Sequence, residues 1–234
     1  MTKTEIFLEK YKELEKEAVS AYHYPQDGSA VSRLERRKEF KDIAVELSYC
    51  RDVRNLLAHN QRIGESFAVE PSDAMIALME ETLEKVKNPV RCVDVWVPFN
   101  KMIWRTKKDN VLQTMQVMRS AGFSHVPTLD NRRVTGVFSA STVFNHLING
   151  NRLTVEESST FAEIEDALQL EAHGHEGFAF LPLDARLCDA EDLYMEAFKQ
   201  TNENKRIVMF FLTQNGNAGE KVEGLMTLLD LLGN

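Results

Sequence analysis

The amino-acid sequence predicts an α+β protein, with an all-α helical domain at the N-terminus followed by two β-α-β-β-α units. Two observations predict this fold class: apolar residues recur at helical spacing through residues 1–88, and a pattern in the remaining chain repeats at an offset of 88 positions. In each copy, two apolar runs flank a tight turn, which is typical of a β-hairpin. The predicted domains are 1–88 and 89–234, with the first copy at 89–150 and a linker and the second copy at 151–234.

Three amphipathic helices are predicted in the N-terminal domain. The first spans 5–22 and ends before a breaker cluster at 24–29. The second runs to about Ala58, and the third starts after Ser72, a good N-cap residue, and stops at Asn88-Pro89. Their apolar faces consist of Phe7, Tyr11, Leu14, Ala18 and Tyr22, then Phe40, Ile43, Leu47 and Cys50, then Met75, Met79, Leu83 and Val86.

Arg54 interrupts the apolar face of the second helix. Extending the spacing of Leu47 and Cys50 leads to Arg54 and then Leu57, so a guanidinium projects from the side that faces the core. A buried cation needs a partner. One interpretation is therefore structural, with Arg54 paired to a carboxylate such as Asp52 or one from another helix.

The segment Arg54-Asn55-Leu56-Leu57-Ala58-His59 has a second interpretation. It resembles the signature of the HEPN family, helical domains named for higher eukaryotes and prokaryotes nucleotide-binding. The resemblance implies a homodimer that cleaves RNA without a metal ion, in which His59 takes the 2′-hydroxyl proton, Arg54 holds the scissile phosphate and Asn55 positions it. An imidazole that titrates near neutral pH and a guanidinium that matches phosphate oxygens suit this chemistry. The structural interpretation of Arg54 and His59 stays open beside it.

The strongest pattern in the chain is the internal repeat. Residues 133–142 match residues 221–230, and both read as a basic residue, Val, any residue, Gly, two apolar residues, and Ser or Thr. Each match follows a turn, Asp130-Asn131 in the first copy and Asn215-Gly216 in the second. The apolar runs before the turns are 123–129 and 207–212, and the helical patterns before those contain Val111, Met115, Met118, Leu193, Ala197 and Phe198.

This order of elements, with His125-Val126-Pro127 in the first inner strand, looks like a tandem pair of CBS domains, named after cystathionine β-synthase, over about residues 89–234. The second copy is more divergent, because Arg206-Ile207-Val208 stands where a Pro motif is expected. Other segments fit the family: the opening Val93 to Pro98, a strand at Met102 to Trp104, a helix start at Lys108 to Val111, a linking segment at 151–172 and a second opening strand at 178–183.

The CBS resemblance implies an adenine nucleotide, AMP, ADP or ATP, as a regulatory ligand, with no required cofactor. Thr227-x-x-Asp230 matches the family's ligand-binding element, and with Gly224 it forms the better site. A helix N-terminus attracts phosphate, and an Asp three residues on can accept ribose hydroxyl groups. The same residues also fit a capping box that needs no ligand. The weaker second site consists of His125, Pro127, Ser139 and Thr142, where Thr142 replaces the acid.

Composition narrows the functional classes. Of the 234 residues, 43% are hydrophobic and 27% are charged, and the net charge of −8 argues against coating of duplex nucleic acid or of an anionic membrane. The three cysteines Cys50, Cys92 and Cys188 have no metal-like spacing and fit free thiols. No signal-peptide core and no run of about 18 apolar residues is present. We therefore expect a cytoplasmic protein with neither a metal site nor a membrane partner.

Two functions follow as hypotheses. The first is a regulatory module that binds an adenine nucleotide between its CBS units, couples it to the helical domain and forms a homodimer. The alternative is a nucleotide-gated, metal-independent endoribonuclease using Arg54, Asn55 and His59 across that homodimer, with RNA as its partner. His173-Gly174-His175-Glu176 is interpreted as a solvated loop rather than a metal site. Five residues are interpreted as core rather than as adenine platforms: Phe138, Phe144, Phe210, Phe211 and Met226.

Overall fold

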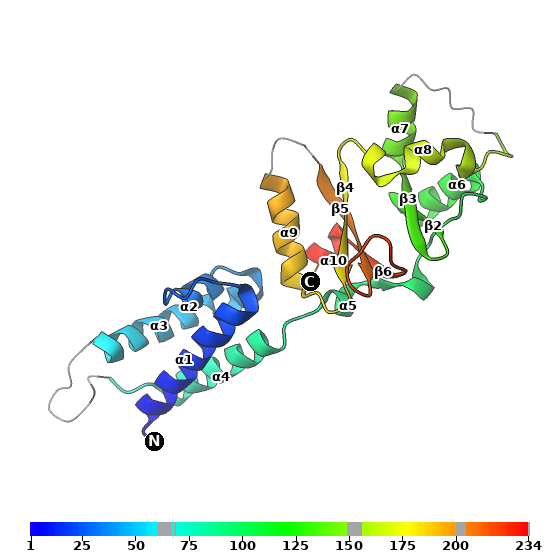
Figure 1. Cartoon of the computed structure of the whole chain (residues 1–234). Coiled ribbons are helices and arrows are strands. Elements are labelled where there is room, and N and C mark those ends of the chain that lie inside the picture. Colours follow the sequence, from blue (N-terminus) through cyan, green and yellow to red (C-terminus); the bar gives the residue numbers. More distant parts are fainter. Residues whose placement is uncertain (60–66, 68, 149–155, 200–204, 234) are drawn as a thin grey trace. The chain divides into compact units, whose positions relative to one another are not determined.

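The chain divides into two compact units, Met1–Pro89 and Val90–Asn234, referred to below as the N-terminal and C-terminal units (Figure 1). The computed structural model describes residues 1–59, 67, 69–148, 156–199 and 205–233. The N-terminal unit contains helices alone among its described residues, and the C-terminal unit combines helices with two sheets, so the predicted α+β class is confirmed. None of the helices within the described residues combines the length and apolar character needed to cross a membrane.

The N-terminal unit is built on the predicted amphipathic faces. Phe7 and Leu14 of one helix pack with Leu47 and Met79 of the others, and all four side chains are fully buried. Ser72 is an N-cap, as predicted, and its hydroxyl accepts a hydrogen bond from the Met75 backbone amide at 3.2 Å. The elements are α1 Lys3–Tyr22, α2 Ala30–Leu34, a 3₁₀ turn Lys38–Ile43, α3 Ala44–His59 and α4 Asp73–Lys87.

Two details of the N-terminal unit differ from the sequence prediction. The second predicted helix begins at Ala44, because Phe40 and Ile43 lie in the preceding 3₁₀ turn. The short α2 was not predicted. Its three buried residues, Ala30, Val31 and Leu34, are too few to establish a helical period, so tertiary packing rather than a local pattern defines this element.

The C-terminal unit contains both copies of the repeat. Asn110 caps α6 by accepting a hydrogen bond from the Gln113 amide at 2.8 Å, and the β2–β3 turn places Asn131 and Arg132 at positive φ. The elements of the first copy are α5 Cys92–Val95, β1 Val97–Pro98, a 3₁₀ turn Phe99–Lys101, α6 Val111–Ala121, β2 His125–Asp130, β3 Arg133–Ser139 and α7 Ala140–Ile148. Those of the second are β4 Glu176–Pro182, α9 Leu187–Lys199, β5 Arg206–Thr213, β6 Val222–Thr227 and α10 Leu228–Leu232.

The predicted strand at Met102 to Trp104 is wrong. The strand that the first copy contributes at its start is β1, and the following chain reaches β2 only through a single parallel bridge between Arg105 and Thr128. The link between the copies holds a 3₁₀ turn Phe161–Ile164, the short helix α8 Glu165–Leu168 and a 3₁₀ turn Leu170–Ala172.

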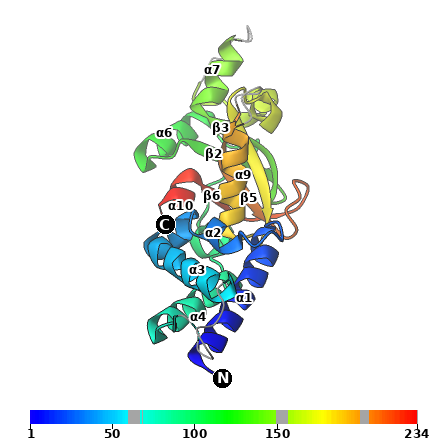
Figure 2. The ribbon, with the colours of Figure 1, turned by 90° about the vertical axis from the view of Figure 1, so that its left-hand side faces the viewer.

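The strands form a four-stranded sheet in the order β1-β6-β5-β4 and a separate β2–β3 hairpin. Strand β4 runs parallel to β5, whereas the other pairs are antiparallel. Helix α9 lies along the β4–β5 side of the sheet in both views and packs on β5 (Figures 1 and 2). Because β1 belongs to the first copy and pairs with β6 of the second, the two copies share one sheet.

Strand β5 is buried on both faces, which explains its continuous apolar sequence. Phe210 and Leu212 pack in the cluster that contains residues of α9, whereas Met209 and Phe211 pack in the cluster that contains Leu129 and Val137 of the hairpin. Most of the predicted core aromatics are buried, but Phe144 on α7 is 63% exposed, so that prediction is wrong for Phe144.

The repeated glycines, Gly136 and Gly224, lie where backbone or ring atoms approach closely. A Cβ at Gly136 would lie 2.3 Å from the Leu168 carbonyl oxygen, and one at Gly224 would lie 2.3 Å from the Trp96 ring. Gly224 also pairs with Pro98 across the β1–β6 ladder. The repeated glycine is therefore explained by packing between chain segments.

We expect Gly224→Ala to destabilise the protein by about 1–3 kcal/mol, the usual cost of overpacking a filled site. Urea unfolding followed by circular dichroism measures this loss. Gly219→Ala is the matched control, because nothing lies within 4 Å of a Cβ built at Gly219 and its φ is not positive. A Gly224→Ala variant as stable as the wild type would contradict the packing role.

Candidate functional site

The C-terminal unit contains a cleft of about 550 Å³ between parts of both copies. The first copy contributes the chain around Ile103 and the α6–β2 loop with Ser124 and His125. The second contributes the start of β5 and the junction of β6 with α10, which includes Thr227 and Asp230. The cleft is within the size range of small-molecule sites.

The walls of the cleft combine apolar and charged groups. Val97, Ile103 and Met209 line it with aliphatic or thioether atoms, while Lys101 and Asp230 are its fixed charges at neutral pH. His125 adds a group that can become cationic. A ligand with an apolar ring and an anionic end matches this distribution.

Thr227 and Asp230 form a capping box, as one of the two sequence interpretations predicts. The Asp230 carboxylate accepts hydrogen bonds from the Thr227 backbone amide at 2.7 Å and from its hydroxyl at 2.8 Å. The capping bonds leave both residues in the lining of the cleft, so capping and ligand contact are compatible. Gly224, the third residue assigned to this site from sequence, is buried against Trp96 instead.

The corresponding position in the first copy is closed. Ser139 and Thr142 are each 1% exposed, and they cap one another: the Ser139 amide donates to the Thr142 hydroxyl at 3.0 Å, and the Thr142 amide donates to the Ser139 hydroxyl at 3.3 Å. Pro127 is buried inside β2, opposite Val137. The four residues His125, Pro127, Ser139 and Thr142 therefore do not line a common open pocket.

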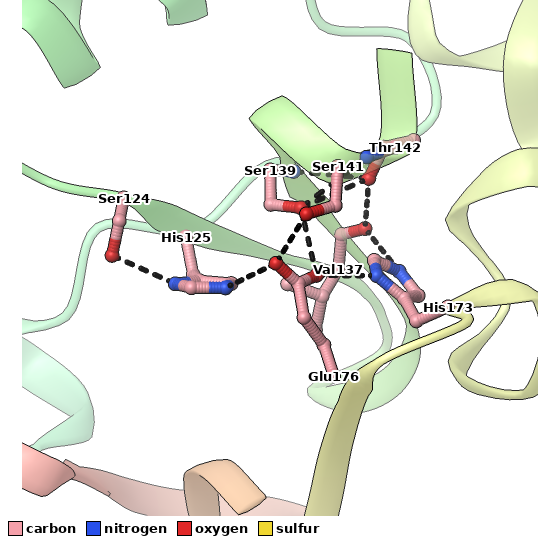
Figure 3. A network of polar contacts seen from close by, with 8 residues as sticks. All are labelled: Ser124, His125, Val137, Ser139, Ser141, Thr142, His173 and Glu176. Carbon is pink, nitrogen blue, oxygen red and sulfur yellow. Dashed lines mark hydrogen bonds and ion pairs between the residues drawn. The ribbon is translucent and has the colours of Figure 1, made fainter. Parts of the chain in front are cut away.

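Glu176, the first residue of β4, supplies the carboxylate that the first copy lacks at Thr142 (Figure 3). The Ser139 hydroxyl donates to Glu176 Oε2 at 2.9 Å, and the Ser141 hydroxyl donates to Oε1 at 2.7 Å. A carboxylate from the second copy therefore lies at the N-terminal end of α7, where the sequence analysis placed the weaker nucleotide site.

His173 completes this arrangement. Its ring is buried, with Nδ1 2.7 Å from Glu176 Oε2 and Nε2 3.0 Å from the Val137 carbonyl oxygen. Both nitrogens face oxygen acceptors, and Nδ1 lies within ion-pair distance of the Glu176 carboxylate. Burial of Glu176 opposes its ionisation, but contacts with His125, His173 and the two serine hydroxyls outweigh burial and hold the pKa of Glu176 well below its usual range.

The interpretation of His173-Gly174-His175-Glu176 as a solvated loop is wrong for its two ends. His173 is buried and Glu176 begins a strand, while Gly174 and His175 between them are exposed. The signal that sequence reasoning missed is that an apolar run begins two residues after Glu176, which places the carboxylate at the start of a strand. Across the residues that the structure describes, no three or more His, Cys, Asp or Glu side chains are arranged to hold a metal ion.

His125 has two environments. It lines the cleft, and its Nε2 lies 3.2 Å from Glu176 Oε1 in an ion-pair contact that is not aligned as a hydrogen bond. Its Nδ1 lies 2.8 Å from the Ser124 hydroxyl. His125 lies opposite Ser139 in the β2–β3 ladder, and its ring lies between the network around Ser139 and the cleft of Thr227.

Arg54 has a partner on another helix, as the structural interpretation predicts. Its Nη2 lies 3.5 Å from Glu15 Oε2 of α1, its guanidinium lies over the Tyr11 ring, and its Nη1 donates to Asn55 Oδ1 at 3.2 Å. His59 ends α3, and its side chain lies outside the described part of the structure. No observation among the described residues favours RNA cleavage, and the homodimer and RNA stay predictions.

Comparison with known proteins identifies CBS-domain structures as similar. No protein-family model and no curated protein sequence matches the chain. A hemolysin-like protein containing a CBS domain from Oenococcus oeni PSU is 13% identical, with a TM-score of 0.41, over 66% of this chain and 95% of its own. The CBS domain of the bacterial CNNM/CorC family Mg²⁺ transporter in complex with ATP is 15% identical, with a TM-score of 0.40, over 61% and 84%. CBSX2 in complex with AMP is 14% identical, with a TM-score of 0.42, over 62% and 94%.

Proposed function

We propose that the C-terminal unit is a CBS-domain pair that binds one adenine nucleotide, AMP, ADP or ATP, in the cleft beside Thr227 and Asp230. The nucleotide acts as a regulatory ligand whose binding is coupled to the helical domain at residues 1–88. The observation that carries this proposal is the cleft itself, which brings a Thr-x-x-Asp element of the second copy together with residues of the first.

The chemistry of the cleft supports a nucleotide. Val97, Ile103 and Met209 offer apolar surface for a base, and the Asp230 carboxylate can accept ribose hydroxyl groups. Lys101 and His125 offer positive charge for phosphate. This combination of one acid and two basic groups around an apolar wall matches the three parts of a nucleotide.

A single nucleotide per chain is part of the proposal. The equivalent position in the first copy holds the Glu176 carboxylate, which accepts hydrogen bonds from Ser139 and Ser141. A phosphate brought there would meet a like charge in a partly buried site, which is unfavourable. The Thr142 position therefore stays closed to nucleotides.

The test is calorimetric titration with AMP, ADP and ATP. At least one of them is expected to bind and to raise the melting temperature with concentration, because a ligand that binds only the folded state stabilises it by RT ln(1 + [L]/Kd). Asp230→Ala is expected to weaken binding at least about tenfold, which equals about 1.4 kcal/mol.

A matched control separates ligand contact from capping. Glu163 caps Thr160 in the same way that Asp230 caps Thr227, with the Thr160 amide donating to Glu163 at 2.9 Å, but it does not line the cleft. Glu163→Ala should keep full affinity. Equal loss of binding in both variants, or no binding of any of the three nucleotides at millimolar concentration, would overturn the proposal.

A further inference from the structure

His125 connects the cleft to a charged network beneath it. His125 is the first residue of β2, and its side chain is 16% exposed. The imidazole ring lies between Ser124 at the cleft and Glu176 of β4 (Figure 3). Its Nε2 is buried and approaches Glu176 without a hydrogen-bond alignment. A charge placed in the cleft therefore acts on His125, and through it on Glu176.

Glu176 is the centre of the polar network beneath the cleft. His173, on the segment before β4, contacts the Glu176 carboxylate through Nδ1 and the Val137 carbonyl oxygen through Nε2. The remaining partners from β3 and α7, Ser139 and Ser141, are neutral. A proton added to His125 thus adds one positive charge to this network, directly beside the cleft.

Other charged groups near the ring come from three elements. Lys101, at the end of a 3₁₀ turn, and Asp230 of α10 line the same cleft and have opposite charges. Arg206 of β5 is the strand neighbour of Glu176, but its guanidinium lies over the Phe198 ring at 5.6 Å. Lys101 and Asp230 line the cleft on one side of the His125 ring and Glu176 lies on the other, so a ligand charge in the cleft acts on the His125–Glu176 contact together with these two groups.

Resting on the proposed function, we infer that Glu176 is a positioning residue that holds a protonated His125 toward the cleft, so that an anionic ligand binds together with a proton. The carboxylate orients the ring from beneath and stabilises its positive form. A bound phosphate would add a second stabilising charge on the opposite side. By linkage, protonation of His125 then strengthens ligand binding by the same factor by which the ligand strengthens protonation.

The sign of the effect follows from this linkage. An unperturbed imidazole takes up its proton near pH 6.5, within the range that calorimetry covers. Affinity should therefore rise as pH falls from about 8 to about 6. Because the terminal phosphate of a nucleotide itself titrates near pH 6, the effect must be read as a difference between the wild type and a variant without the imidazole.

The experiment measures binding of the tightest-binding of AMP, ADP and ATP by calorimetry at both pH values and in buffers of different ionisation enthalpy, which gives the number of protons taken up. Relative to His125→Gln, the wild type is expected to gain about fivefold or more in affinity at the lower pH and to take up a few tenths of a proton more. Glu176→Gln should lose both differences. His146→Gln, the same change at a histidine that neither lines the cleft nor contacts Glu176, should keep them.

A ligand-free measurement covers the case in which Glu176→Gln does not fold. NMR titration of the His125 ring should show a lower titration midpoint in Glu176→Asp than in the wild type, because the shorter side chain withdraws the carboxylate while keeping its charge. An unchanged midpoint would overturn the inference. Equal proton uptake by the wild type and His125→Gln would also overturn the inference and leave nucleotide binding intact. If none of AMP, ADP and ATP binds at any pH, the proposed function and the inference are overturned together.

Discussion

Replacing Glu176 with glutamine is expected to destabilise the C-terminal unit by about 3–5 kcal/mol, because it removes the carboxylate from an ion-pair contact with the buried His173 ring and from two serine hydroxyl donors. The His173 side chain is fully buried and the Glu176 side chain is 14% exposed, so water cannot replace the lost charge. Urea unfolding followed by tryptophan fluorescence measures the loss. Trp96 and Trp104 are the only tryptophans in the sequence, so the signal reports on the C-terminal unit alone.

The pH dependence provides a check on the mechanism. The folded structure lowers the pKa of Glu176, so its contribution to the free energy of unfolding is present above the ordinary carboxyl value, about 4.3, and is lost as pH falls further. The stability difference between the wild type and Glu176→Gln should shrink below about pH 4. Glu171→Gln, the same change at an exposed position, should stay within about 0.5 kcal/mol of the wild type. A constant difference across the acidic range would contradict the ion pair.

Removing the Phe211 ring should have a similarly large effect. Phe211 is fully buried, its ring stacks on Phe180 with centroids 5.3 Å apart, and it packs in the cluster that joins the four-stranded sheet to the hairpin. Phe211→Ala is expected to lower the free energy of unfolding by about 3–5 kcal/mol, through lost burial and the cavity left behind. The same fluorescence measurement applies.

Phe144→Ala is the control for this substitution. It deletes the same ring from a side chain that is 63% exposed, so the free energy of unfolding should change by no more than about 0.5 kcal/mol. Equal losses in the two variants would show that the destabilisation does not come from the core between the sheets.

Much of the secondary structure could be predicted because its causes are local. The faces of α1 and α4 repeat at helical spacing, Ser72 and Asn110 offer oxygens to backbone amides, and the turns at Asn131 and Gly216 use residues that tolerate positive φ. The repeated glycine could also be recognised in the sequence, as part of the internal repeat. The reason for a glycine at this position could not be predicted, because close packing on Leu168 or Trp96 depends on chain segments far away in sequence.

The candidate site was predictable in part. Thr227 and Asp230 line the cleft because a motif four residues long places both at one helix end. His125 was named and grouped with Ser139, which lies opposite it in the β2–β3 ladder, but its second position beside Thr227 was not predicted. Its place at the cleft depends on how the two copies pack against each other.

The α+β class, the three long helices of the N-terminal unit and the two copies of the repeat can be predicted from the amino-acid sequence, because periodicity, capping and turn formation involve residues that are close along the chain. Two other features arise from tertiary packing: β1 of the first copy completes the sheet of the second, and Glu176 occupies the end of α7 beside Ser139. These are contacts between distant segments. They depend on which surfaces are buried together, and no local pattern specifies which carboxylate reaches which helix end.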